Sequence, residues 1–269
     1  MRCRPWTAYP WHLSQPNYIQ RRIMTTKSIV LITGASQGLG YFAAQQLAST
    51  GDHHVIVGSR NLAKSKETVE KLVAATPSSK AFEAIEIDVT SDASILAAVK
   101  HVEEKHGRLD MLLNNAGITT DHAISDTSAI RSTYHSLYDT NLFGAVATTE
   151  MFLPLLHKGN GKRIAFTSSG LGSLKWASES DDIMSAINLP IYRSTKTALN
   201  MVMLHYAKLL EPQGFVVSAA DPGYCSTNLT SFVGGRPPTD GARVLVRALL
   251  GKKEDVHAAV IDDSGKEPW

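Results

Sequence analysis

Tyr192 and Lys196 are the residues of this chain whose types and spacing most directly suggest chemistry. They stand four positions apart in a stretch with helical periodicity, so both side chains project from one face of a helix. An ammonium group beside a phenol stabilises the phenolate and lowers the pKa of the phenol toward neutrality. Tyr192 is therefore a candidate general acid or base for a carbonyl or an alcohol. The alternative is a solvated surface pair, which the same spacing also produces.

A glycine-rich turn at residues 33–40, Thr-Gly-Ala-Ser-Gln-Gly-Leu-Gly, is a candidate anion site. It follows an apolar run and leads into a helical pattern, and this order presents backbone N–H groups at a helix N-terminus. Gly34, Gly38 and Gly40 stand where a Cβ would block the tight turn, the approach of a pyrophosphate or the packing of helix on strand. The spacing differs from the commoner dinucleotide fingerprint, and no Lys-Ser or Lys-Thr follows as in a P-loop.

Apolar strands alternate with amphipathic helical stretches along the rest of the chain. The alternation predicts βαβ crossovers and a central parallel sheet with helices on both faces, a single doubly wound (Rossmann-type) α/β domain over residues 28–269. The expected strands are residues 28–32, 54–57, 82–87, 109–113, 163–167, 215–219 and 258–261. The expected helices are residues 38–50, 62–75, 92–106, 127–157, 190–211 and 239–250.

The predicted strands end in polar residues, and ligands of such sheets bind beyond the carboxyl ends of the strands. The second strand is followed by Arg60, at a place where an acid would bind the ribose of NAD and an arginine accommodates the 2′-phosphate of NADP. The fourth runs into Asn-Asn-Ala-Gly at residues 114–117, which suits close backbone approach or forms a plain Asx turn. The fifth is followed by the hydroxyl groups of Ser168 and Ser169.

The composition is that of an ordinary globular protein, with 43% apolar and 19% charged residues among 269. A net charge of +2 favours neither nucleic acid nor a membrane surface as a partner. The two cysteines, Cys3 and Cys225, fit a reducing compartment, so a cytoplasmic protein is expected. The ten histidines show no metal-binding spacing, and the pair His53-His54 is expected at the surface. No metal is predicted.

In this order and spacing, the motifs resemble those of the short-chain dehydrogenase/reductase family. The resemblance covers residue 28 to the C-terminus and rests on the glycine-rich turn, the Asn-Asn-Ala-Gly turn and the tyrosine–lysine pair. Asn141, Ser169 and the Asp-Pro-Gly at residues 221–223, followed by Thr227, also match. The family implies a nicotinamide cofactor and the transfer of a hydride between that cofactor and a carbonyl or alcohol.

The resemblance implies four catalytic residues. Tyr192 would protonate the carbonyl oxygen in reduction, while Lys196 would lower the pKa of Tyr192 and bind the nicotinamide ribose. Ser169, rather than Ser168, would orient the substrate oxygen. Asn141 would hold a water that links Lys196 to solvent.

The resemblance also implies a set of cofactor contacts, with Asp88 at the adenine, residues 115–117 at the ribose and residues 222–227 at the carboxamide. Cys225 falls in that last loop, where it is expected to be a small packed thiol. Besides Tyr192 and Lys196, the full set is Gly34, Ser36, Gln37, Gly38, Leu39, Gly40, Arg60, Asp88, Val89, Asn115, Ala116, Gly117, Pro222, Gly223, Cys225 and Thr227.

Two features depart from typical members. Extra residues at 176–189 separate Ser169 from Tyr192, as in members similar to monomeric carbonyl reductases. A homodimer and a monomer both stay open, because this insertion could cover the helix face on which relatives commonly dimerise. Gln37 stands where several NADP-using members have a basic residue, so a 2′-phosphate would rest on Arg60 and Ser36.

The sequence therefore predicts an NADPH-dependent reductase of a ketone or aldehyde, with alcohol oxidation as the reverse reaction. Two alternatives share the fold: a catalytically silent NADP-binding regulatory or scaffold protein, and an isomerase or dehydratase that uses the same tyrosine–lysine pair. The intact Ser169, Tyr192 and Lys196 favour turnover. The identity of the small-molecule carbonyl substrate stays open, and the short loop at residues 228–238 predicts an open pocket.

Residues 1–27 differ from the rest because they contain no acidic residue and show no periodicity. They form an expected irregular, dispensable extension, or reflect a start codon assigned too early, given Met24. Their four arginines leave a mitochondrial transit peptide as the alternative.

Overall fold

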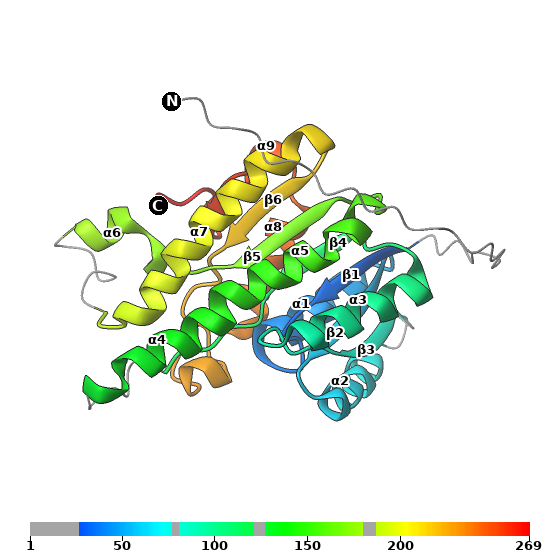
Figure 1. Ribbon diagram of the computed structural model, residues 1–269, viewed down its shortest axis with the longest axis horizontal. Helices are drawn as coiled ribbons and strands as arrows, with labels where there is room; N and C mark the ends of the chain where they lie inside the picture. Colours follow the sequence, from blue (N-terminus) through cyan, green and yellow to red (C-terminus); the bar gives the residue numbers. More distant parts are fainter. Residues whose placement is uncertain (1–26, 77–80, 121–126, 180–186) are drawn as a thin grey trace.

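A seven-stranded parallel sheet forms the centre of the part of the chain that the computed structural model describes, residues 27–76, 81–120, 127–179 and 187–269 (Figure 1). The strand order is β3-β2-β1-β4-β5-β6-β7, so the chain changes direction across the sheet between β1 and β4. The strands are β1 (Ser28–Ile32), β2 (His53–Ser59), β3 (Phe82–Glu86), β4 (Met111–Asn114), β5 (Arg163–Thr167), β6 (Val216–Ala220) and β7 (Val260–Ile261). The predicted doubly wound fold is confirmed. Residues 1–26 of the expected extension lie outside the described residues.

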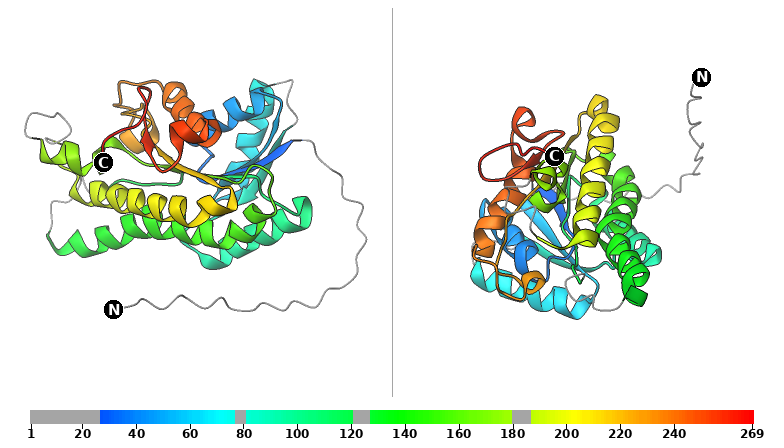
Figure 2. Two further views of the ribbon diagram at one scale, coloured as in Figure 1. Left: turned by 90° about the horizontal axis from the view of Figure 1, so that it is seen from above. Right: turned by 90° about the vertical axis from the view of Figure 1, so that its left-hand side faces the viewer.

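Helices cover both faces of the sheet (Figure 2). The strands are apolar at successive positions because each face needs its own set of side chains. In β1, Ile29 and Leu31 belong to the core on one face, while Val30 and Ile32 belong to the core on the other. The first core is covered by α3 (Asp92–His106), α5 (Gly144–His157) and α7 (Pro190–Leu210), and the second by α1 (Gly38–Ser49), α2 (Leu62–Ala75) and α8 (Pro238–Leu250).

The single helix expected over residues 127–157 is wrong in detail. A 3₁₀ turn (Thr127–Ala129) leads into α4 (Ile130–Tyr138), a short π-helix (Asp139–Phe143) and then α5. The hydrophobic periodicity continues through the π-helix, so the sequence pattern does not reveal it. Such π-helical segments inside helices are frequently found at functional sites, and this one carries Asn141.

Short elements were also missed. They are α6 (Leu174–Ser178), at the start of the expected insertion, α9 (Lys253–Val256), and 3₁₀ turns at Gly170–Gly172, Glu211–Gln213 and Asn228–Thr230. Residues 180–186 of the insertion lie outside the described residues. Among the helices that are described, none combines the length and the apolar character needed to cross a membrane.

The expectation that His53 and His54 precede a strand at the surface is wrong. Both residues belong to β2, His53 is buried, and the side chain of His54 is 21% exposed. The predicted strand, residues 54–57, begins one residue too late and left His53 outside.

Candidate active site

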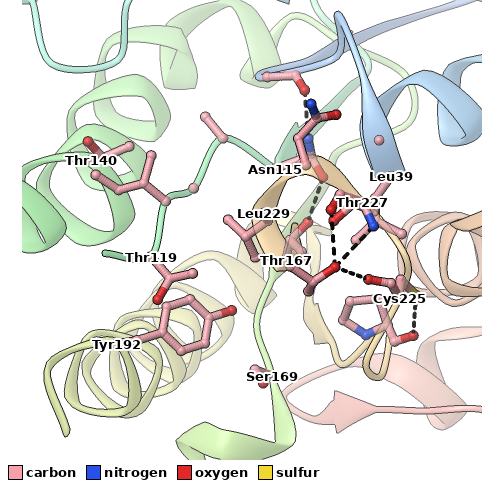
Figure 3. A pocket seen from close by; sticks show the side chains of 18 of the residues that line it. Leu39, Asn115, Thr119, Thr140, Thr167, Ser169, Tyr192, Cys225, Thr227 and Leu229 are labelled. Carbon is pink, nitrogen blue, oxygen red and sulfur yellow. Dashed lines mark hydrogen bonds between the residues drawn. The ribbon is translucent and has the colours of Figure 1, made fainter. Parts of the chain in front are cut away.

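A cavity of about 620 Å³ opens at the carboxyl ends of the strands, on both sides of the β1–β4 junction (Figure 3). This is the position at which open parallel sheets bind ligands, and its volume suits a small organic molecule. All but two of the site residues expected from the sequence line it, Gly40 and Asn141 being the exceptions.

The glycine-rich turn between β1 and α1 lies so close to the next loop that side chains would not fit. A Cβ on Gly34 would come within 2.8 Å of the Ala116 Cα, and Gly34 has a positive φ of 65°. A Cβ on Gly40 would come within 2.6 Å of the Asn115 side chain. The absence of side chains at Gly34 and Gly40 therefore lets the turn lie against the Asn-Asn-Ala-Gly loop.

Hydrogen bonds hold these two loops together. The Thr33 hydroxyl accepts from the backbone N–H groups of Asn115 (3.0 Å) and Ala116 (3.1 Å). In return, the Asn115 amide donates to the carbonyl oxygens of Thr33 (2.9 Å) and Gly34 (3.1 Å). The Asn115 side chain thus joins its own loop to the glycine-rich turn, which is more than a plain Asx turn requires.

The first turn of α1 has the features of an anion site. Its N-cap residue, Gln37, makes no side-chain hydrogen bond to the helix, so the N-terminal N–H groups are not capped in that way. Ser36, Gln37, Gly38 and Leu39 all line the cavity at this turn. The glycine-rich turn at residues 33–40, called the glycine cradle below, and the uncapped helix end fit the pyrophosphate of a dinucleotide.

Tyr192 and Lys196 are buried in α7, which excludes the surface-pair alternative. They are 9% and 4% exposed, and the Lys196 Nζ lies 5.5 Å from the centre of the Tyr192 ring. The Lys196 ammonium donates to the carbonyl oxygen of Thr167 at 2.7 Å. Burial lowers the pKa of Lys196 to about 8, against the opposing effect of the negative charge of Asp221.

The two serines after β5 have different surroundings. Ser168 is 1% exposed and donates to the side-chain oxygen of Asn200 at 2.6 Å. Ser169 is half-buried, and its hydroxyl accepts from the Leu171 N–H at 3.2 Å while keeping its own proton free to donate elsewhere. Figure 3 shows Ser169 just beyond β5, with the ring of Tyr192 projecting from α7 beside Thr119. These surroundings favour Ser169 over Ser168 as the hydroxyl that faces a ligand.

Asn141 links the loop after β4 to α7 through its side-chain amide. Its Oδ1 accepts from the Ile118 N–H at 2.8 Å, and its Nδ2 donates to the Ile118 carbonyl (2.9 Å) and to the Thr195 hydroxyl (3.2 Å). The π-helix therefore positions the loop that follows β4 against α7. The expected water between Asn141 and Lys196 stays a prediction.

The cavity is also lined by Arg60, Asp88 and Cys225. Arg60 is exposed, and within the described residues it has no ion pair. Asp88 accepts from the Thr90 N–H and hydroxyl, at 3.0 and 2.8 Å. The Cys225 thiol is buried and donates to the Pro222 carbonyl, and burial raises its pKa, which agrees with a packed thiol.

Several cavity residues were not expected from the sequence. They have no motif of their own, because their positions depend on how loops fold back over the site. They are Ile87, Thr90, Ile118, Thr119, Thr140, Thr167, Leu171, Ile187, Leu189, Asn228, Leu229, Thr230, Ser231 and Val233. The loop after Thr227 thus lies along the cavity although it is short.

The sheet topology, the glycine cradle and the buried tyrosine–lysine pair together define a dinucleotide-dependent oxidoreductase site of Rossmann type. A family model described as short chain dehydrogenase matches residues 28–235. The chain belongs to this family, and it is an oxidoreductase that uses a nicotinamide cofactor.

Curated relatives are named as members of this family, and a solved structure shares the fold. The chain is 43% identical to the short-chain dehydrogenase anuI of Penicillium roqueforti, over 88% of this chain and 95% of that one. It is 34% identical to the short-chain dehydrogenase/reductase tropE of Talaromyces stipitatus, over 92% and 100%. A structure of NADPH-bound carbonyl reductase from chicken fatty liver superposes with a TM-score of 0.77 at 24% identity, covering 91% of this chain and 100% of that one.

Proposed function

We propose that this protein reduces a ketone or aldehyde with NADPH. The observation that carries the proposal is the buried pair Tyr192 and Lys196, which lines the same cavity as the glycine cradle. A protein that only binds a nucleotide has no use for a lysine whose burial lowers its pKa to about 8 beside a tyrosine. NADPH supplies the hydride when bound.

The protein groups handle the substrate oxygen and its proton. Ser169 donates a hydrogen bond that orients the carbonyl, and the Tyr192 hydroxyl delivers the proton. Lys196 places a positive charge 5.5 Å from the centre of the tyrosine ring, which favours loss of the phenolic proton. Thr167 fixes the Lys196 ammonium through its carbonyl oxygen.

NADPH is preferred over NADH on the basis of Arg60. Its exposed guanidinium follows β2 at the rim of the cavity and can bind a phosphate through two parallel hydrogen bonds. The preceding residue, Ser59, is uncharged, so it does not repel a phosphate as a carboxylate at that position would. Its buried hydroxyl is hydrogen-bonded to the Ser65 hydroxyl (2.8 Å) and to the Asn61 carbonyl (2.9 Å). Solved structures that share the fold carry NADPH in one case and NADH in another, so the choice rests on Arg60.

The substrate end of the cavity is apolar. Ile118, Leu171 and Leu189 pack around Tyr192, and Leu229 and Val233 also line the cavity. We therefore expect a carbonyl compound with a sizeable apolar or aromatic body, in preference to a small charged keto acid.

A screen of NADPH oxidation over quinones, aromatic aldehydes, α-diketones and polyketide-like ketones tests the proposal. Absorbance loss with a member of the panel, and formation of the matching alcohol or hydroquinone, supports a reductase. Stoichiometric NADPH binding without turnover across the panel would instead indicate a regulatory or scaffold protein. Product formation without a net change in NADPH absorbance would indicate an isomerase or dehydratase.

A further inference from the structure

A cluster of basic side chains surrounds Glu83 near the amino ends of β2 and β3, far from the strand ends that form the active site. Figure 1 shows α3 lying along these two strands. Three imidazoles and one ammonium reach the Glu83 carboxylate, from His54 in β2 and from His101, Lys105 and His106 in the last turns of α3.

The distances divide the cluster in two. The Nε2 atoms of His54 and His106 lie 3.0 and 2.8 Å from Oε2 of Glu83. The His101 Nε2 (2.6 Å) and the Lys105 Nζ (2.9 Å) bind the other oxygen, Oε1. One carboxylate oxygen and two imidazole nitrogens therefore converge on one side, while the second oxygen is held by separate partners.

The carboxylate is buried among its partners. Glu83 is 7% exposed, so its polar contacts are made with these side chains and not with bulk water.

We propose that His54, Glu83 and His106 bind a zinc ion. Their ligand atoms lie within 4.8 Å of one another. Two imidazole nitrogens and one carboxylate oxygen are a ligand set that zinc accepts, with water in the fourth position.

The ion requires an adjustment of the side chains. Zinc holds nitrogen and oxygen ligands at about 2.0–2.2 Å, so two ligands in a tetrahedron stand about 3.3 Å apart. The His54 and His106 nitrogens are now 3.0 and 2.8 Å from the Glu83 oxygen and within 4.8 Å of each other. Rotation of the two imidazoles therefore has to widen the first two separations and set the third near 3.3 Å. His54 is 21% exposed, which leaves a path for the ion.

The surrounding groups suit a bound ion. His101 holds Oε1 of Glu83, which orients the carboxylate for coordination through Oε2 alone, as partners of metal-bound carboxylates do. Lys105 is half-exposed and can turn its ammonium group toward solvent when the dication arrives. The ion would join β2, β3 and the end of α3, so its role is structural.

The test is a zinc titration of the full-length, tag-free protein after removal of metal with a chelator. We expect one zinc ion per chain at this site and a Kd that rises at least tenfold in His54→Gln and in His106→Gln. His135→Gln, an exposed histidine on α4, is the matched control and keeps the parent Kd. Replacement of zinc by Co²⁺ gives the visible absorption of a tetrahedral site in the parent, and this absorption is lost in both cluster variants.

Thermal unfolding provides a second readout that does not depend on chemistry at the active site. Zinc at about a hundred times the parent Kd should raise the Tm of the parent by roughly 5 °C and that of His106→Gln by about half as much or less. Absence of saturable binding, or equal Kd values in the parent and in both cluster variants, overturns the proposal. Circular dichroism in chelator confirms that each variant is folded before the titration.

Discussion

Two buried charged side chains, Lys196 and Glu83, lie toward opposite ends of the strands and are compensated to different degrees. Lys196 donates to one carbonyl oxygen, and burial lowers its pKa to about 8. Glu83 receives four basic side chains, which hold its pKa well below the ordinary value. The protein thus leaves a charge under-compensated at the edge where the cofactor and substrate bind, and fully compensated at the other.

The difference follows from what each edge is for. A group that changes its protonation or its partners during a reaction cannot already have all of its hydrogen bonds and charges paired within the protein. An active site therefore lowers the free energy of unfolding through strain or desolvation of such groups. A group that holds elements together loses nothing by being satisfied. Substitutions at the two edges should therefore change activity and stability in opposite ways.

The largest effect is expected at Tyr192. Tyr192→Phe removes the proton donor and little volume, so kcat should fall by about 10²–10⁴-fold while the Kd for NADPH stays close to that of the parent. Steady-state kinetics and a fluorescence titration of NADPH measure the two quantities. Tyr134→Phe, at an exposed ring on α4, is the control and should keep the parent kcat. A variant at Tyr192 that kept a tenth of the parent rate would contradict the assigned mechanism.

The next effect separates two adjacent serines. Ser169→Ala should lower kcat by roughly 10²-fold, because it removes a hydrogen bond to the substrate oxygen. Ser168→Ala removes a buried hydrogen bond to Asn200, so it should cost about 1 kcal/mol in the free energy of unfolding and little activity. Kinetics and urea unfolding of both variants give the answer. The reverse pattern would show that Ser168 is the hydroxyl at the substrate.

At the opposite edge, Glu83→Gln should reduce stability without reducing kcat. The substitution removes a buried charge from among four donors, and the loss should be about 2–3 kcal/mol in the free energy of unfolding. Urea unfolding in the presence of chelator measures it free of any metal contribution. Glu104→Gln serves as the control, because Glu104 is exposed and pairs with Lys100 at 3.8 Å on the same helix. It should change stability by less than about 0.5 kcal/mol, and an equal loss in the two variants would remove the contrast between the edges.

Lys196→Met should abolish activity and yet stabilise the protein without cofactor. Lowering the pKa of Lys196 from 10.5 to about 8 corresponds to a cost of about 3 kcal/mol for keeping the lysine charged in the fold. The lost hydrogen bond to Thr167 offsets part of the gain, which leaves a net stabilisation of about 1–2 kcal/mol near neutral pH.

The pH dependence of this difference has a definite sign. Between pH 8 and 10.5 the unfolded lysine binds a proton that the folded one has released, so the parent gains stability as the pH rises through this window. The advantage of the methionine variant is therefore fully present below pH 8 and fades toward pH 10.5. Urea unfolding of both proteins at several pH values tests this, and a variant less stable than the parent at neutral pH would contradict it.

The fold was predictable because the strands are buried on both faces. Alternate residues of β1 enter two different cores, so the strand reads as a continuous apolar run, and all seven predicted strands agree with the structure to within two residues. The gathering of the candidate site residues around one cavity was predictable for a related reason. Its residues follow strand ends or share one helix face, and both placements can be read from local order.

The Glu83 cluster was not predictable from local order. His54, Glu83 and His106 are separated by 29 and 23 residues, spacings that match no metal motif. They meet because Glu83 pairs with Ile56, two residues after His54 on the same face of β2, and because α3 ends over that face. Strand register and helix length decide such a cluster, and neither is visible in a residue spacing.

The smallest predicted effect concerns an exposed cation at the active-site edge, Arg60, in contrast to the paired Lys105. A charge-assisted hydrogen bond contributes roughly 1.5–3 kcal/mol, which corresponds to about a 10–150-fold preference for NADPH over NADH in kcat/KM. Gln37 adds no second positive charge, so the preference should lie in the lower half of this range, and Arg60→Ala should reduce it by about tenfold.

The free energy of unfolding should not change in Arg60→Ala, because Arg60 has no ion pair among the described residues. Lys66→Ala, an exposed cation on α2 that does not line the cavity, is the matched control. Because the interaction is solvent-exposed, added salt should weaken the preference of the parent more than that of the variant. Equal kcat/KM values for the two cofactors in the parent would refute the role given to Arg60.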